Sequence, residues 1–299
     1  MLKQLLKNFI TRAAQSFGWD LVLLPKNLQK RITATKADLG FWYTGDVFSS
    51  SDIAYGIFRN GLVEKSETEL VINILNHLQT TSQLINFYDV GANSGYYGIL
   101  AAYLGKGKIN TYSFEPLSEY TEMIKETVIM NELDAKVKIF DTALGSEKKT
   151  GVINISGSGS SLVSEFLGNT DNLPKRNIPI NLLDEVIVEK SLPQPDFIKI
   201  DVEGFEYDVL LGAKNTLSNS KPILFIEIAN SLKRHDKTFI NDKSKIIFDL
   251  LRNLGYNAFV VKGSTIEATD AVIEDEGVYM YLFLNKFQPS HISFNPLNT

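Results

Sequence analysis

A row of acidic side chains, each placed where a short apolar run ends, is the part of this sequence best suited to chemistry. Carboxylates accept hydrogen bonds from hydroxyl and amino groups and attract positive charge. If the apolar runs are parallel strands, their carboxyl ends meet at one edge of a sheet, and the acids converge there. The acids are Asp89, Glu115, Asp141, Asp201, Glu203 and Glu227.

The glycine-rich turn Asp-Val-Gly-Ala-Asn-Ser-Gly favours a nucleoside cofactor. Small residues let the backbone approach a ligand and expose the amides of the helix that follows. The spacing differs from the Gly-x-Gly-x-x-Gly of dinucleotide-binding turns. Asp89 would repel a pyrophosphate but attract the sulfonium and amino groups of S-adenosylmethionine. We therefore expect Asp89, Gly91, Asn93 and Gly95 to bind this cofactor.

Two further acids fit the rest of the same molecule. Glu115 follows the run Ile109–Phe114, where a carboxylate can accept hydrogen bonds from both ribose hydroxyls of an adenosine. Asp141 follows Val137–Phe140 and is placed to accept a bond from the adenine amino group. One strand-end carboxylate alone is equally compatible with a solvated cap, whereas three in order favour a binding site.

The motif Ile-Asp-Val-Glu-Gly supplies the candidate catalytic group. Asp201 and Glu203 lie two residues apart, so an extended backbone presents both to one side. Such a pair could act as a base, orient an alcohol, bind Mg²⁺ or Ca²⁺, or simply accept bonds from helix amides. We rank Asp201 first as the base, followed by Glu203 and by Glu227 at the end of the next run. His235 is a less favoured base.

Apolar runs that alternate with helical patterns predict an α/β fold, with a mostly parallel sheet covered on both faces. We expect seven strands, the last two forming an antiparallel hairpin. The expected strands are Ile85–Val90, Ile109–Phe114, Val137–Phe140, Ile198–Ile200, Ile223–Ile228, Ala258–Val261 and Val278–Leu284. The expected helices are Ser66–Thr80, Tyr97–Leu104 and Leu117–Asn131.

Composition divides the chain into three parts. Residues 1–60 are a basic amphipathic arm with an aromatic docking segment, residues 61–287 the main domain, and residues 288–299 a polar tail. Within the domain, residues 145–195 are far longer than an ordinary connection. Apolar pieces of this elaborated segment could add edge strands, and its glycine- and serine-rich run 156–161 could cover a pocket as a lid.

The net charge of −5 is unevenly spread, because the first 36 residues carry about +6 and the remainder about −11. Apolar residues at helical spacing between Leu2 and Phe17 predict an amphipathic helix. This helix would either dock on the main domain or contact an anionic membrane surface. No apolar run resembles a secretory signal or a membrane span, so we expect a cytoplasmic protein, with peripheral membrane contact as an option.

Two classes of function are excluded or disfavoured by composition. The chain has 0 Cys, which excludes cysteine nucleophiles and thiolate zinc sites. The acidic balance of the main domain argues against nucleic acid as a partner.

Together these motifs resemble the FkbM family of S-adenosylmethionine-dependent methyltransferases, over roughly Glu64 to Val261. The resemblance implies a Rossmann-like class I methyltransferase fold and O-methylation, commonly of a sugar hydroxyl on a glycan, glycolipid or macrolide. It implies cofactor positions at Asp89, Gly91, Asn93, Gly95 and Glu115. It rests on the segments Tyr88–Tyr97, Phe114–Pro116, Ile200–Gly204 with Glu206, Leu211–Gly212 and Ile226–Glu227.

We therefore expect an O-methyltransferase with S-adenosylmethionine as cofactor and a sugar-containing or other hydroxylated acceptor, and no nucleic acid partner. A divalent metal such as Mg²⁺ is a secondary option, because oxygen ligands are plentiful. One alternative is a nicotinamide-dinucleotide oxidoreductase, which the spacing of the glycine turn disfavours. Another is a non-catalytic accessory of a glycan pathway that binds the cofactor.

Overall fold

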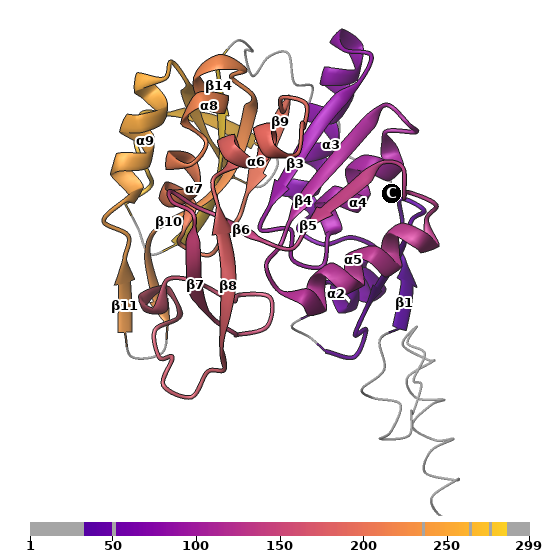
Figure 1. Cartoon of the computed structure of the whole chain (residues 1–299), viewed down its shortest axis with the longest axis horizontal. Coiled ribbons are helices and arrows are strands. Elements are labelled where there is room, and N and C mark those ends of the chain that lie inside the picture. Colours follow the sequence, from indigo (N-terminus) through magenta and orange to yellow (C-terminus); the bar gives the residue numbers. More distant parts are fainter. Residues whose placement is uncertain (1–32, 50–51, 235–236, 263–264, 275–276, 286–299) are drawn as a thin grey trace, which may run out of the picture.

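The structure is a computed structural model in which a central sheet carries helices on both faces (Figure 1). It describes residues 33–49, 52–234, 237–262, 265–274 and 277–285. Across this described part, no helix is both long and apolar enough to cross a membrane. The predicted N-terminal amphipathic helix, the polar tail and His235 lie outside it.

The central sheet has nine strands, eight of them side by side in the order β13-β12-β14-β10-β9-β3-β4-β5. Neighbours from β10 to β5 pair in parallel, whereas β14 runs antiparallel to both β10 and β12. The strands are β3 (Ile85–Val90), β4 (Ile109–Phe114), β5 (Val137–Phe140), β9 (Phe197–Ile200), β10 (Ile223–Arg234), β11 (Lys237–Ile240), β12 (Asn257–Lys262), β13 (Thr265–Thr269) and β14 (Gly277–Leu284).

The predicted Rossmann-like α/β class is confirmed, and all seven expected strands lie in this sheet. The number seven is too small, because β11 pairs with the far part of β10 and β13 extends the edge at β12. The expected hairpin is likewise interrupted: β12 and β14 pair antiparallel, but β13 lies between them in the chain. Both added strands are short and partly polar, so hydrophobic patterning gives little sign of them.

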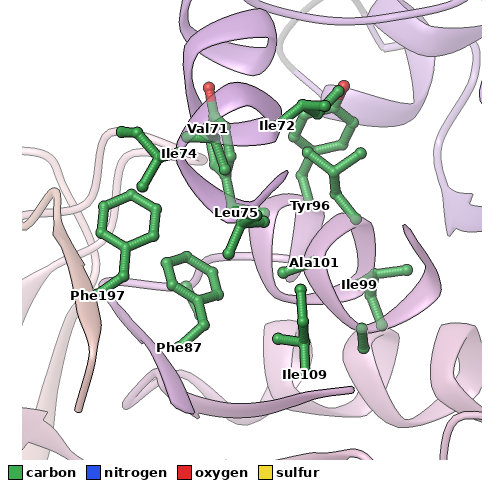
Figure 2. Packing of buried hydrophobic residues seen from close by; sticks show 14 of the residues in the cluster. Val71, Ile72, Ile74, Leu75, Phe87, Tyr96, Ile99, Ala101, Ile109 and Phe197 are labelled. Carbon is green, nitrogen blue, oxygen red and sulfur yellow. The ribbon is translucent and has the colours of Figure 1, made fainter. Parts of the chain in front are cut away.

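Alternating side chains of the strands build two apolar layers. Phe87 packs with residues of the helices α3 (Lys65–Thr81) and α4 (Tyr96–Leu104), whereas its neighbour Tyr88 packs in the opposite layer. Figure 2 shows Ile74 and Leu75 of α3 above the rings of Phe87 and Phe197. The opposite layer involves α6 (Leu183–Glu189), α7 (Glu206–Leu211), α8 (Lys214–Asn219) and α9 (Ser244–Asn253).

The aromatic segment before the main domain is part of the same core. It forms β1 (Thr33–Lys36), β2 (Trp42–Gly45) and α2 (Ile53–Asn60), and the two strands pair antiparallel. Phe41 and Tyr43 are fully buried with residues of α3 and α4. The Thr44 amide and hydroxyl bond to Thr127 of α5 (Ser118–Met130). This segment therefore packs against the main domain as one core.

The elaborated segment forms a small separate sheet, in the order β6-β8-β7. Its apolar pieces do form strands, as predicted, but they pair with each other rather than with the main sheet: β7 runs antiparallel to β8. The short strand β6, just before the segment, runs parallel to β8. The elements are β6 (Ala143–Leu144), β7 (Lys149–Asn154), the 3₁₀ turn η1 (Ser164–Leu167) and β8 (Lys175–Asn181).

Candidate active site

One cavity lies at the carboxyl edge of the parallel strands and collects most of the predicted site residues. The ends of β3, β4 and β9 form its floor together with Glu227 inside β10, because these four strands are parallel neighbours in the sheet. The small sheet contributes Ile153 of β7 to an apolar wall, and Leu162, between β7 and η1, adds to it. The predicted site residues that line the cavity are Asp89, Gly91, Asn93, Glu115, Asp201, Glu203 and Glu227.

The glycine turn brings β3 into close contact with the end of β9. Gly91 has φ 76°, and a Cβ at this position would overlap the carbonyl oxygen of Asp201. Only glycine combines this left-handed backbone with such a close approach. Asn93 also has a positive φ, 51°, and its side-chain amide donates to the carbonyl of Ser158 at 3.1 Å. The turn is thus tied both to the strand below and to the serine-rich run above.

Asp89 is buried at the base of the turn, with 1% of its surface exposed. Its Oδ2 accepts a hydrogen bond from the Gly98 amide of α4 at 3.0 Å, while its buried Oδ1 has no hydrogen-bond partner. Burial raises the pKa of Asp89 to about 6, and the nearby Lys199 ammonium partly opposes this rise. Asp89 thus lines the cavity while one of its oxygens accepts from a helix amide.

Glu115 closes β4 with both carboxylate oxygens engaged by backbone amides. Oε2 accepts from Asn93 at 3.0 Å, and Oε1 accepts from Leu117 at 2.9 Å. Burial raises the pKa of Glu115 to about 7, although these two bonds favour its ionised form. Each oxygen of an ionised carboxylate has a second acceptor position, so Glu115 can still receive two ligand hydroxyls.

Three carboxylates converge beside the turn: Asp201 and Glu203 follow the end of β9, and Glu227 lies within β10. Oxygen atoms of Asp201, Glu203 and Glu227 lie within 4.8 Å of one another. Burial, and then the charges of Asp201 and Glu203, raise the pKa of Glu227 well above its ordinary value. Burial and the neighbouring negative charges thus favour the protonated form of Glu227.

Sequence reasoning missed Lys199, which is central to this cluster. Its ammonium lies 2.7 Å from Oδ2 of Asp201 and 4.7 Å from the ring centroid of Tyr97. Lys199 is 3% exposed. Burial alone would lower its pKa, but the charges of Asp201, Asp89 and Glu64 together raise it above the ordinary value. The available signal was a lysine inside the apolar strand Phe197–Ile200, directly before an aspartate.

Other missed residues come from outside the recognised motifs. Glu64, at the start of α3, lines the cavity and accepts a hydrogen bond from the Tyr97 hydroxyl at 2.6 Å. The Tyr43 hydroxyl donates to Oγ of Ser94 at 2.7 Å and so braces the glycine turn. No pattern in the sequence marked either contact, because each joins segments that are far apart in the chain.

The serine-rich run does lie over the cavity. Ser158 and Ser160 line it, and the Ser161 hydroxyl donates to the carbonyl of Glu203 at 2.6 Å. The expected position of a cover is thereby confirmed, whereas its opening and closing stay a prediction.

Two predicted cofactor residues do not line the cavity. Gly95 begins α4 with φ 87° and contacts Ile124, so its part is to shape the turn. The Asp141 side chain is 61% exposed and lies 4.0 Å from Lys125. The structure does not bring Asp141 to the other acids, and the adenine contact expected for it finds no support in this geometry.

A metal ion finds less support than the cofactor. Asp201, Glu203 and Glu227 are the one group of three or more potential ligands in the described part of the chain. Acidic clusters are common at protein surfaces without metals, and the Lys199 ammonium already offsets part of this charge. Nothing else among the described residues points to Mg²⁺.

Comparisons with known proteins agree with this geometry. The profile of the Methyltransferase FkbM domain matches residues 89–258. The hexuronic acid methyltransferase AglP of Haloferax volcanii is 24% identical over 165 residues, which are 55% of this chain and 64% of that protein. The pentatricopeptide repeat-containing protein 1, apicoplast, of Plasmodium falciparum is 27% identical over 175 residues, 55% of this chain and 27% of that protein. The chain thus covers less than two thirds of the length of both curated relatives.

Solved structures are also similar, at low sequence identity. The methyltransferase FkbM of Methylobacillus flagellatus KT gives a TM-score of 0.44 and 15% identity, covering 93% of this chain and 70% of that one. A SAM-dependent methyltransferase of Agrobacterium tumefaciens gives 0.46 and 11%, covering 91% and 75%. The domain match spans more than half of the chain and includes the glycine turn and the three carboxylates. The chain therefore belongs to the FkbM family of S-adenosylmethionine-dependent methyltransferases.

Proposed function

We propose that this protein transfers the methyl group of S-adenosylmethionine to a hydroxyl group, and that the acceptor is a sugar in a glycan, glycolipid or glycosylated metabolite. The observation that carries the proposal is the convergence of Asp201, Glu203 and Glu227 within 4.8 Å, in the same cavity as the glycine turn. A methyl acceptor with a weakly acidic hydroxyl needs a group that takes its proton.

The order of the strands suggests how the cofactor would lie. Glu115, at the end of β4, would accept bonds from the ribose hydroxyls. The adenine would then extend toward the inserted sheet, where Ile153 and Leu162 offer an apolar surface. The sulfonium would lie over Gly91, next to the carboxylates that follow β9 and to Glu227 within β10.

The bound cofactor supplies a methyl carbon on positive sulfur, and sulfur takes the electron pair when that bond breaks. The oxygen of the acceptor hydroxyl would bond to the methyl carbon, and Asp201 would accept the proton that this hydroxyl loses. The carboxylate is 26% exposed at its side chain and is held by Lys199, so it is accessible and oriented. Glu203 and Glu227 would position the hydroxyl, since alignment supplies much of the acceleration in such a displacement.

The sugar acceptor is supported by one relative, which is named as a hexuronic acid methyltransferase. An acidic acceptor edge also suits neutral or hydroxyl-rich molecules better than nucleic acid phosphates. A cytoplasmic location and peripheral membrane contact stay predictions.

The test is a methyl-transfer assay with labelled S-adenosylmethionine and a panel of acceptors. The panel would contain free hexoses, hexuronic acids, their nucleotide-linked forms and a short RNA. We expect label in a sugar acceptor, and Asp201→Asn should lower that rate by roughly 100-fold or more. Asp208→Asn is the matched control, since Asp208 pairs with Lys243 at 3.0 Å outside the cavity.

Two outcomes would contradict the proposal. Label in the RNA alone would reject the sugar acceptor, and full activity of Asp201→Asn would reject its role as base. Repeating the assay after chelation with EDTA tests the metal option, and loss of activity that Mg²⁺ restores would establish it.

A further inference from the structure

Glu64 is a cavity residue that the FkbM domain match does not include, because that match begins at residue 89. It precedes α3 and reaches the cavity beside Tyr97 of α4. Glu64 is exposed, so a ligand in the cavity can approach its carboxylate. Neither the glycine turn nor the Asp-Val-Glu-Gly motif accounts for an acid at this point.

The conformation of Glu64 is held by specific contacts. Its φ is 44°, a left-handed backbone that costs a residue with a side chain some free energy. Its carbonyl accepts from the Thr68 amide at 2.8 Å, and Oε2 accepts from the Tyr97 hydroxyl at 2.6 Å. Burial and the charge of Glu64 raise the pKa of Tyr97 well above its ordinary value, so the phenol keeps its proton and donates. The carboxylate is therefore fixed at the cavity wall.

The position of Glu64 along the sheet edge indicates which part of a ligand it meets, given the cofactor placement proposed above, on which this inference rests. With the ribose at Glu115 on β4, the amino-acid tail of the cofactor points in the opposite direction from the adenine. That direction leads past Gly91 on β3 to Glu64 and Tyr97.

The tail carries an ammonium group, which requires an accessible anion. Asp89 was the residue expected from the sequence to attract it. However, Oδ2 of Asp89 is bonded to the Gly98 amide, and Oδ1 is buried. Asp201 is paired with Lys199 and follows β9, next to β10, where the acceptor hydroxyl is proposed to bind. Glu64 remains as the exposed carboxylate at this end of the cavity.

We propose that Glu64 binds the α-ammonium group of the methionine part of S-adenosylmethionine, and that the Tyr97 hydroxyl holds it in position to do so. The segment that precedes the matched domain thereby completes the cofactor site. The ammonium would bond to the Glu64 carboxylate while the hydrogen bond from Tyr97 is retained, because a carboxylate accepts several bonds at once.

The experiment uses isothermal titration of the full chain with two ligands. One is S-adenosylhomocysteine, and the other is its des-amino analogue, which keeps the carboxylate but lacks the ammonium. The variants are Glu64→Gln, which keeps the size of the side chain, and Glu67→Gln as a matched control. Glu67 lies in the first turn of the same helix but does not line the cavity. Thermal unfolding of each variant confirms that it is folded.

Glu64→Gln should raise the Kd of S-adenosylhomocysteine about tenfold, because a charge-assisted hydrogen bond is lost. It should change the Kd of the des-amino analogue by less than about twofold. Glu67→Gln should bind both ligands as the wild type does. Unchanged binding of S-adenosylhomocysteine by Glu64→Gln, or an equal loss of affinity for both ligands, overturns the role of Glu64. Neither outcome overturns the cofactor placement. No binding of S-adenosylhomocysteine by the wild type overturns the cofactor placement as well.

Discussion

The ammonium of Lys199 lies 2.7 Å from Oδ2 of Asp201, at the point where β9 enters the cavity. The same ammonium lies 4.7 Å from the centroid of the Tyr97 ring, so a cation–π contact also fixes it. This buried cation therefore restrains the Asp201 carboxylate beside Glu203 and Glu227. Under the proposed function, Lys199 would be a positioning residue for methyl transfer.

Replacing this cation should affect the rate more than cofactor binding. We expect Lys199→Met to lower kcat by roughly 10- to 100-fold, because Asp201 loses the partner that orients it. The Kd of S-adenosylhomocysteine should change by less than about threefold, and titration calorimetry measures it. Lys243→Met, which breaks the Lys243–Asp208 pair outside the cavity, should leave kcat unchanged. A loss of cofactor affinity as large as the loss of kcat would refute this assignment.

The close approach of Gly91 to Asp201 predicts a steric effect on stability. Gly91→Ala should reduce the free energy of unfolding by about 3 kcal/mol or more, because its Cβ would overlap the Asp201 carbonyl. Gly157→Ala separates this overlap from backbone strain. Gly157 also has a positive φ, 59°, but nothing lies within 4 Å of the added Cβ.

Gly157→Ala should therefore cost only about 1 kcal/mol. Denaturant unfolding of both variants gives the two free energies. Equal losses in the two variants would show that the contact with Asp201 does not constrain the turn.

The raised pKa of Glu115 leads us to expect that cofactor binding depends on pH. Its pKa is raised to about 7, and only the ionised form accepts bonds from two ribose hydroxyls with both oxygens. Affinity for S-adenosylhomocysteine should therefore rise with pH up to about 7 and then level off. Calorimetric titrations from roughly pH 5.5 to roughly pH 8.5, on both sides of this pKa, measure the effect. In Glu115→Gln, affinity should be lower and this rise should be absent.

Glu206→Gln is the matched control for that experiment. Glu206 is buried and its pKa is also raised to about 7, but it does not line the cavity. The variant should keep the pH dependence of binding. If Glu206→Gln abolishes it and Glu115→Gln does not, the ribose assignment is wrong.

The same pKa shift also affects the stability of the ligand-free protein. Stability should fall as the pH rises, whereas affinity for the ligand should increase. The folded-state pKa of Glu115 lies above the value of 4.5 expected in the unfolded chain. The folded protein therefore binds more protons between these values, and its stability falls as the pH rises from about 4.5 to about 7. Glu115 alone contributes up to about 3 kcal/mol to this fall. Thermal unfolding should show a smaller decline in Glu115→Gln than in the wild type.

Strands and their terminal acids could be predicted well from the sequence. Ile85–Val90, Ile109–Phe114 and Val137–Phe140 have the same bounds in the prediction and the structure. Compact apolar runs between polar turns are a strong local signal for buried parallel strands. Since parallel strands end on one side, Asp89, Glu115, Asp201 and Glu203 were expected to converge at one edge, and all four line the cavity.

What could not be predicted depends on contacts between distant segments. Asp141 follows its strand in the same way as Glu115, yet it turns to solvent near Lys125. Pairing of β7 with β8 gives a separate sheet, because hydrophobic patterns do not specify the partner of a strand. Glu64 reaches the site only because α3 packs beside α4, and Lys199 was hidden in an apolar run.

In the proposed arrangement, S-adenosylmethionine lies across the carboxyl edge of the sheet, with its ribose on the carboxylate that follows β4. A crystal structure of the protein with S-adenosylhomocysteine would show this arrangement. We expect both ribose hydroxyls within hydrogen-bond distance of Glu115 and the sulfur above Gly91, facing Asp201. Density for the nucleoside outside this cavity, or a ribose that does not contact Glu115, would contradict it.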